Sequence, residues 1–136
     1  FAMRTAALSG VDVRLMIPYE TDTKIVEWAS RTYVLATVKA GVKVYLYKAG
    51  FNHSKLLVAD DSIATIGSTN VDFRSFENDF EANAFFYDKK IALEVKDIFL
   101  KDQEECVALE DVRNLTHRSF LQRLWESMVR LLSPLL

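Results

Sequence analysis

Four residues that could act on a phosphate group stand close together in the stretch "HSKLLVADDSIATIGSTN", residues 53–70. It begins with His53 and Lys55 and ends with Ser68 and Asn70. Histidine is the side chain best suited to act as a nucleophile or proton carrier at neutral pH. A lysine ammonium and an asparagine amide can hold the non-bridging oxygens of a phosphate and stabilise charge that develops on them. These residue types therefore predict a site for a phosphate group.

The apolar residues between the two ends of this stretch predict a β-hairpin. Its turn is expected at Asp60-Asp61 or one residue further along the chain. The first register puts Ser68 opposite His53, and the second puts Asn70 opposite His53. In both registers "GSTN" returns beside "HSK", so we expect the polar ends of the stretch to meet at one end of a sheet.

Three further features of the stretch have supporting roles in this interpretation. His53 and Lys55 are two residues apart, so on a strand they share one face. Asp60 lies about 16 Å from Lys55 along an extended strand, which places it in the turn, where it serves the structure. Gly67 has no side chain, so it leaves room for a substrate to approach the backbone. Ser68 follows it as part of the same supporting segment.

The order of these residues resembles the HKD motif of the phospholipase D superfamily. His53-x-Lys55 is followed, after four residues, by Asp60 and, after six more, by Gly67-Ser68-x-Asn70. The segments "SGVDVRLMIP", "ASRTY", "AGVKVYLYKAGFN" and the closing "RLLSPLL" are similar to the C-terminal half of bacterial cardiolipin synthases. The resemblance covers essentially the whole chain. The family also uses a glutamate downstream of the histidine, which the "DFE" context places at Glu81, with Glu77 as the weaker candidate.

The resemblance implies that the catalytic residues are His53, Lys55, Asn70 and Glu81. A carboxylate that accepts the imidazole Nδ1 proton would fix the tautomer and leave Nε2 free to act. Enzymes of this family build one active site from two HKD motifs, whereas this chain has one. The other histidine, His117 in "LTHRSF", has serine at the lysine position and is interpreted as a surface or capping residue. The second motif is expected in an N-terminal half, which the start without an initiator Met favours, or in a partner subunit.

The function implied by the resemblance is that of a cardiolipin synthase. Such a phosphatidyl transferase joins two phosphatidylglycerols and releases glycerol through a phosphatidyl-histidine intermediate. Whether His53 is the nucleophile or the general acid and base is left open, with a preference for the second role. The alternatives are a phospholipase D-like phosphodiesterase or nuclease active as a homodimer, and a catalytically silent interaction module. The expected partners are phosphatidylglycerol, an anionic phospholipid, and the half with the second motif. The full-length protein is expected at the bacterial cytoplasmic membrane, and this fragment by itself is expected to be soluble.

The composition of the chain bears on which of these functions and partners to expect. The chain has 136 residues, 50% hydrophobic and 26% charged, which predicts one domain over residues 1–136. The formal net charge of −2 argues against a nucleic-acid partner. Cys106 is the single cysteine, so the chain has no internal disulfide. The sequence shows no metal-ligand spacing and no Gly-rich nucleotide loop, so we expect neither a metal nor another cofactor.

The elements that must position the motif follow from the hydrophobic pattern. A helix is expected to end at Gly10, and another to run from 21 to 41 with Gly41 at its C-terminal cap. Strands are expected at 11–18, 42–47 and 81–88, and the hairpin occupies 54–66. Two further helices are expected, one at 89–109 and an amphipathic tail helix at 119–132. The acidic segment 102–111 is expected to be solvated. This order predicts an α/β fold with a mixed β-sheet flanked by helices. The tail helix could pack on the domain or lie on an anionic bilayer.

Overall fold

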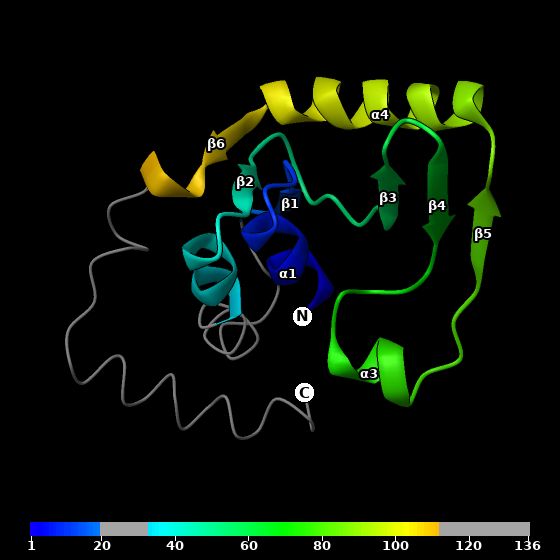
Figure 1. The fold of residues 1–136 in the computed structure, drawn as a ribbon, viewed down its shortest axis with the longest axis horizontal. Helices are drawn as coiled ribbons and strands as arrows, with labels where there is room; N and C mark the ends of the chain where they lie inside the picture. The colour runs from blue at the N-terminus through cyan, green and yellow to red at the C-terminus, as the bar shows by residue number, and fades with distance from the viewer. Residues whose placement is uncertain (20–32, 112–136) are drawn as a thin grey trace. The chain divides into compact units, whose positions relative to one another are not determined.

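The computed structural model describes residues 1–19 and 33–111 (Figure 1). Within them the elements in chain order are α1 (Ala2–Leu8), β1 (Arg14–Pro18), a helical stretch over 33–39, β2 (Lys43–Tyr47), β3 (Leu56–Ala59), β4 (Ile63–Gly67), α3 (Phe73–Glu77), β5 (Asn83–Phe86), α4 (Lys89–Glu104), β6 (Cys106–Ala108) and the 3₁₀ helix η1 (Leu109–Asp111). The chain divides into two compact units, one of residues 1–51 and those from 106 onward, the other of residues 52–105. The prediction of a single domain over 1–136 stays a prediction.

The first unit contains a mixed three-stranded sheet in the order β1-β2-β6. β1 pairs with β2 in parallel, Arg14 opposite Lys43, and β6 runs antiparallel on the other side of β2. Val44 and Leu46 lie two residues apart on β2, so they share a face, and both are buried. The prediction of an α/β fold with a mixed sheet is confirmed, although the described strands form two sheets instead of one.

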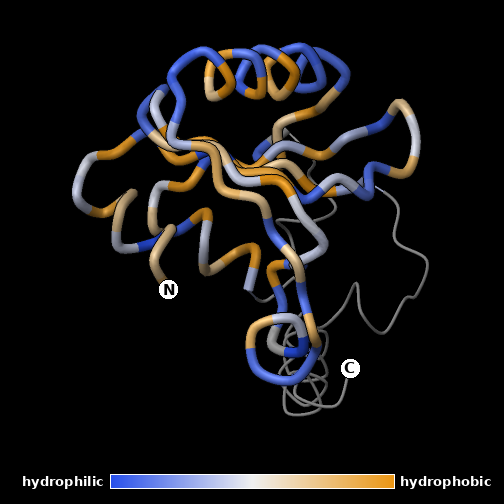
Figure 2. The backbone as a smooth tube through the Cα atoms, turned by 90° about the vertical axis from the view of Figure 1, so that its right-hand side faces the viewer, coloured by the Kyte–Doolittle hydropathy of each residue, from blue (hydrophilic) through white to orange (hydrophobic). Residues whose placement is uncertain are grey.

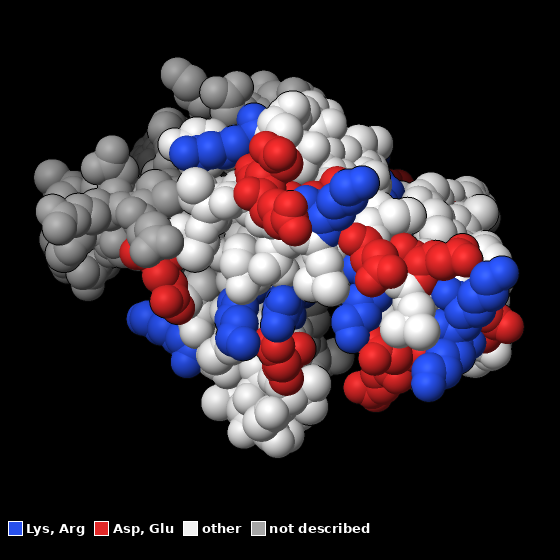
Figure 3. Space-filling model, turned by 90° about the horizontal axis from the view of Figure 1, so that it is seen from above, with Lys and Arg blue, Asp and Glu red and all other residues white. Residues whose placement is uncertain are grey.

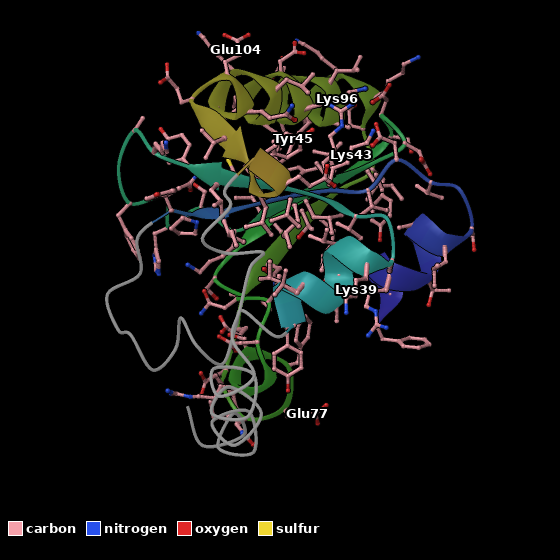
Figure 4. All side chains as sticks on the ribbon, turned by 90° about the vertical axis from the view of Figure 1, so that its left-hand side faces the viewer. Lys39, Lys43, Tyr45, Glu77, Lys96 and Glu104 are labelled. Atoms are coloured by element: carbon pink, nitrogen blue, oxygen red, sulfur yellow. The ribbon has the colours of Figure 1, made fainter. Side chains whose placement is uncertain are left out.

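Asp12 links the start of β1 to β2 through polar contacts with one residue of each strand. Its carboxylate accepts hydrogen bonds from Arg14 at 2.8 Å and forms an ion pair with Lys43, labelled in Figure 4, at 2.8 Å. The hydrogen bond from Arg14, followed by that from Lys43, lowers the pKa of Asp12 from 3.8 to about 2. The carboxylate is therefore charged at neutral pH and bridges the first pair of residues in the β1–β2 ladder.

The second unit is an antiparallel sheet in the order β3-β4-β5 with α4 on one face (Figure 1). Its core consists of Ala64 on β4 with Ala92 and Val95 on α4, and both alanines are 0% exposed. Side chains this small let the helix lie close to the sheet. Figure 2 shows the pattern behind this packing: hydrophobic residues follow the strands, and hydrophilic and hydrophobic residues alternate along α4.

Two polar contacts hold α4 in this arrangement, one at its start and one near its middle. Asp88 caps its start by accepting a hydrogen bond from the backbone N–H of Ile91 at 3.0 Å. Lys96 donates to Asp61 at 2.5 Å and so connects the helix with the turn between β3 and β4. Figure 3, seen from the side on which α4 lies in Figure 1, shows acidic and basic side chains intermixed on that surface.

The hairpin has a register that differs from both predicted ones by one residue. Leu57 pairs with Thr65, and Ala59 pairs with Ile63, so three residues instead of two connect the strands. Two of them, Asp60 and Asp61, have positive φ angles of 51° and 54°. A two-residue turn was the wrong assumption, because aspartate tolerates the left-handed conformation and lets the loop take one more residue.

Other boundaries also differ from the prediction. α4 ends at Glu104 instead of residue 109, and Cys106–Ala108 form β6, which pairs with β2 and is not simply a solvated segment. The short helix α3 was not predicted. The N-terminal helix and Gly41, with a φ of 93°, match the prediction. His117, the tail helix at 119–132 and the first part of the helix predicted at 21–41 lie outside the described residues.

None of the helices in the ranges described above has the length and apolar composition needed to cross a membrane.

A substitution at Asp60 tests the turn. Asp60→Val should lower the free energy of unfolding by about 1–2 kcal/mol, because a β-branched residue disfavours a positive φ. Asp60→Gly should change it by less than about 1 kcal/mol, since glycine accepts this conformation. Urea unfolding followed by circular dichroism measures both. Ser62→Val, in the same turn but without a positive φ, is the matched control, and equal losses in the two valine variants would contradict the turn geometry.

Candidate active site

The antiparallel sheet brings three polar segments together at one end. β3 begins, β4 ends and β5 begins at the end of the sheet near α3, while the β3–β4 turn lies at the other end (Figure 1). The backbone N–H of Gly67 donates to the carbonyl of Lys55 at 3.1 Å. That of Ser68 donates to the carbonyl of Ala82 at 3.0 Å. The expected meeting of "GSTN" with "HSK" is therefore observed, and the residues around 82 join them.

His53 and Lys55 lie just before β3, in irregular backbone. His53 is exposed, and Lys55 is half-buried. The Lys55 ammonium donates to the backbone carbonyl of His53 at 2.8 Å. Asn52 shapes this segment, because its side-chain oxygen accepts from the N–H of Ser54 at 2.9 Å. Because these residues are not in a strand, the alternation of a strand does not determine where the His53 side chain points. The hydrogen bond does place the charged Lys55 ammonium next to the backbone of His53.

Glu81 is the carboxylate of this cluster. One of its oxygens, Oε2, accepts a short hydrogen bond from the Ser68 hydroxyl, and the other, Oε1, accepts one from the Ser75 hydroxyl at 2.5 Å. The bond from Ser68, followed by that from Ser75, lowers the pKa of Glu81. Partial burial opposes this shift, and the positive charge of Lys55 adds to it. The site thus holds an ionised carboxylate whose two oxygens are both engaged.

Glu77, the weaker candidate for this acid, lies elsewhere. It is the last residue of α3 and is exposed. Figure 4 labels it at the α3 end of the unit, with Lys96 of α4 at the opposite end. Glu81 is therefore the glutamate that shares hydrogen bonds with the serine of the motif.

Ser75 is a site residue that the sequence did not reveal. It is 7% exposed and is the only buried polar residue among residues 1–19 and 33–111. Its hydroxyl accepts from the backbone N–H of Asn70 at 3.1 Å and donates to Glu81. Asp72 begins α3 by accepting from the N–H of Ser75 at 2.8 Å. An aspartate followed by a helical stretch is a recognisable N-cap signal, but it does not indicate the contact with Glu81.

Gly67 does not leave space for a ligand in this structure. A Cβ atom at this position would overlap the side-chain amide of Asn83 and the carbonyl oxygen of Ala82. The amide of Asn83 also donates to the hydroxyl of Thr69. The expectation of substrate access at Gly67 is corrected: the missing side chain makes room for Asn83, which joins β5 to the segment between Gly67 and Asn70.

Within the described parts of the chain, no three His, Cys, Asp or Glu residues lie close enough together to bind a metal ion. The segments that meet at this end of the sheet carry an imidazole (His53), an ammonium (Lys55), an asparagine amide (Asn70) and a carboxylate (Glu81). This combination can bind a phosphate oxygen and transfer a proton.

Comparison with known proteins places the chain in a family. A sequence profile described as "Cardiolipin synthase, PLD-like domain" matches residues 1–103. The chain belongs to this family. It is 44% identical over 135 residues to a cardiolipin synthase of Clostridium perfringens, and 46% identical over 140 residues to the major cardiolipin synthase of Bacillus subtilis. In each case the match covers 99% of this chain but 28% of the relative, so the chain spans little more than a quarter of their length.

The fold agrees with the family. A phospholipase D family member of known structure, Nuc from Salmonella typhimurium, superposes with a TM-score of 0.66 over 79% of this chain and 70% of its own. Because the two are 20% identical, this likeness shows a shared fold and nothing more. The predicted resemblance to the phospholipase D superfamily and to cardiolipin synthases is confirmed. This member of the family carries the complete His-x-Lys and Gly-Ser-x-Asn pattern.

Gly67→Ala tests the close approach of β4 and β5. The added methyl group should lower the free energy of unfolding by about 1–3 kcal/mol, the usual cost of overpacking. Adding Asn83→Ala should restore only part of this loss, because the Ala82 carbonyl still occupies the space. Thermal and urea unfolding measure the effect. An unchanged stability of Gly67→Ala would show that the space beside Gly67 is open and would reinstate it as a route for a ligand.

Proposed function

We propose that this chain supplies one half of the active site of a cardiolipin synthase, which joins two phosphatidylglycerols and releases glycerol. The family and the relatives at 44% and 46% identity support this reaction. The observation that carries the proposal is the cluster of Lys55, the ionised Glu81 and the motif serine Ser68 beside the segment of His53. Phosphatidylglycerol lies in a bilayer, so we expect the whole enzyme to act at the bacterial cytoplasmic membrane.

The proposed mechanism divides the reaction between two histidines. One histidine attacks phosphorus, the bond from phosphorus to the glycerol oxygen breaks, and the second histidine gives its proton to that oxygen. The second histidine then removes the proton from a hydroxyl of another phosphatidylglycerol. That oxygen attacks phosphorus, the phosphorus–nitrogen bond breaks, and cardiolipin leaves. We assign His53 to the general acid and base role.

The other residues of the cluster stabilise charge in this mechanism. Lys55 and Asn70 would bind the non-bridging oxygens, where negative charge grows as the phosphorus is attacked. Glu81 would accept the Nδ1 proton of His53 and fix its tautomer. The lowered pKa of Glu81 supports this role, because a carboxylate has to be ionised to accept that proton at neutral pH.

Substitutions in the enzyme that contains this chain test the assignment. His53→Asn should abolish phosphatidyl transfer without unfolding the protein, because the exposed site tolerates a polar group. Lys55→Ala should reduce kcat/KM by the equivalent of about 2–4 kcal/mol, the scale for one lost charge-stabilising donor. Cardiolipin formed from phosphatidylglycerol vesicles is measured. Lys101→Ala, on the exposed side of α4, is the matched control and should be neutral. Normal rates in a folded His53→Asn enzyme would refute the catalytic role.

The need for a second motif gives a further test. A chain with one competent histidine lacks the second histidine of the mechanism, which is the nucleophile when His53 acts as the general acid and base. The loss of either role is costly, and general acid–base help alone is typically worth about 10²- to 10⁴-fold. The 136-residue chain, as a monomer, should therefore transfer essentially no phosphatidyl groups. Activity should return on joining it to a half with the other motif, or in a dimer that faces two copies of His53. Assays on phosphatidylglycerol and on a chromogenic phosphodiester run beside a measurement of mass in solution. Turnover by a proven monomer would contradict the two-motif requirement.

A further inference from the structure

The Ser75 hydroxyl has its hydrogen-bonding direction set by its neighbours. A serine hydroxyl has one proton to donate and lone pairs to accept. The backbone N–H of Asn70 can only donate, so the oxygen of Ser75 accepts that bond at 3.1 Å. Its own proton is then directed to Glu81 Oε1 at 2.5 Å. Because the side chain is 7% exposed, little water is available to replace either bond.

The two oxygens of Glu81 are held from two separate parts of the chain. Ser68, just after β4, binds Oε2, and Ser75, in α3, binds Oε1. The terminal torsion of a glutamate is broad and weakly constrained by itself. With one serine bond alone the carboxylate could rotate about the bonded oxygen, whereas one bond to each oxygen restricts that rotation. The same hydroxyl also holds the backbone N–H of Asn70, the residue whose side chain is the amide of the motif.

We propose that Ser75 is a positioning residue of the active site, which aligns the Glu81 carboxylate with the backbone of Asn70 through one buried hydroxyl. This inference rests on the proposed function, because it gives Ser75 its effect on turnover through Glu81. The lowered pKa of Glu81, to which the Ser75 bond contributes, agrees with the geometry. Ser75 itself has no part in the chemical steps.

A purely structural role for Ser75 makes a different prediction. The helix cap uses the backbone N–H of Ser75 and the side chain of Asp72, so it survives the loss of the hydroxyl. Ser75→Ala therefore removes the contacts to Glu81 and Asn70 while keeping the start of α3. A structural role would lower stability and the fraction of folded enzyme, which lowers the apparent kcat but leaves the titration of Glu81 in the folded molecules unchanged. A positioning role acts on kcat and on the carboxylate of Glu81.

The experiment compares Ser75→Ala and Ser75→Thr in the enzyme that contains this chain. Ser75→Ala should lower kcat about 10- to 100-fold, the range for losing a hydrogen bond to a charged group, with KM changed by less than about threefold. Ser75→Thr keeps the hydroxyl and should recover most of the rate. Ser62→Ala, which removes an exposed hydroxyl from the β3–β4 turn, is the matched control and should leave kcat unchanged.

A second readout does not depend on turnover. The carbon-13 resonance of the Glu81 carboxylate, assigned by its absence in Glu81→Gln, reports its titration. Ser75→Ala should raise the pKa of Glu81 towards its ordinary value, because a bond that favours the charged form is lost. In a Glu81→Gln background, Ser75→Ala should cost less than about twofold in rate on an activated phosphodiester, since the carboxylate that it aligns is absent.

The outcomes separate the two proposals. Wild-type kcat and an unchanged Glu81 titration in Ser75→Ala would overturn the positioning role, as would losses in the single and double variants that simply add. A Ser75→Ala protein that fails to fold, with Ser75→Thr no more active than Glu81→Gln, would also overturn it. By contrast, a wild-type enzyme that makes no cardiolipin, or a folded His53→Asn enzyme that does, would overturn the proposed function and leave the Glu81 titration as predicted.

Discussion

Two serine hydroxyls from different segments hold the Glu81 carboxylate, and the arrangement of the candidate site depends on them. Ser68 follows β4 and Ser75 belongs to α3, so the carboxylate joins the end of the sheet to the short helix beyond it. Both bonds favour the charged form and so lower the pKa of Glu81, although partial desolvation opposes this. Without these donors, an acid beside an anionic substrate would more readily take up a proton and lose its ability to accept one from an imidazole.

The antiparallel sheet of the second unit makes this meeting of segments possible. In such a sheet the start of one strand lies beside the end of its neighbour, so the segments before β3, after β4 and before β5 share one end. α4 fixes the sheet from one face, through contacts that the small Ala64 and Ala92 permit. Gly67 lets β5 approach closely enough for Asn83 to reach Thr69. The packing therefore sets the distances on which the polar site relies.

The charges of the candidate site are compatible with the proposed phosphodiester substrate. Lys55 supplies a cation close to the backbone of His53, and its charge also favours the ionised Glu81. An anion bound at Lys55 would weaken that support, whereas the serine bonds are neutral donors and would persist. Hydroxyl donors would thus favour the charged carboxylate even with an anion bound at the lysine.

The motif His53-x-Lys55, Asp60 and Gly67-Ser68-x-Asn70 was recognisable from the sequence, and the flanking segments indicated the family. Both signals are local, because the residues of each segment are close together in the chain. The existence of the hairpin also followed from local alternation. Its register did not, since positive φ angles at Asp60 and Asp61 allow a longer turn that residue type alone leaves open. β6 is a strand because it pairs with β2, about sixty residues earlier in the chain. Ser75 and Asn83 acquire their roles only through contacts across segments, which packing decides and local sequence does not.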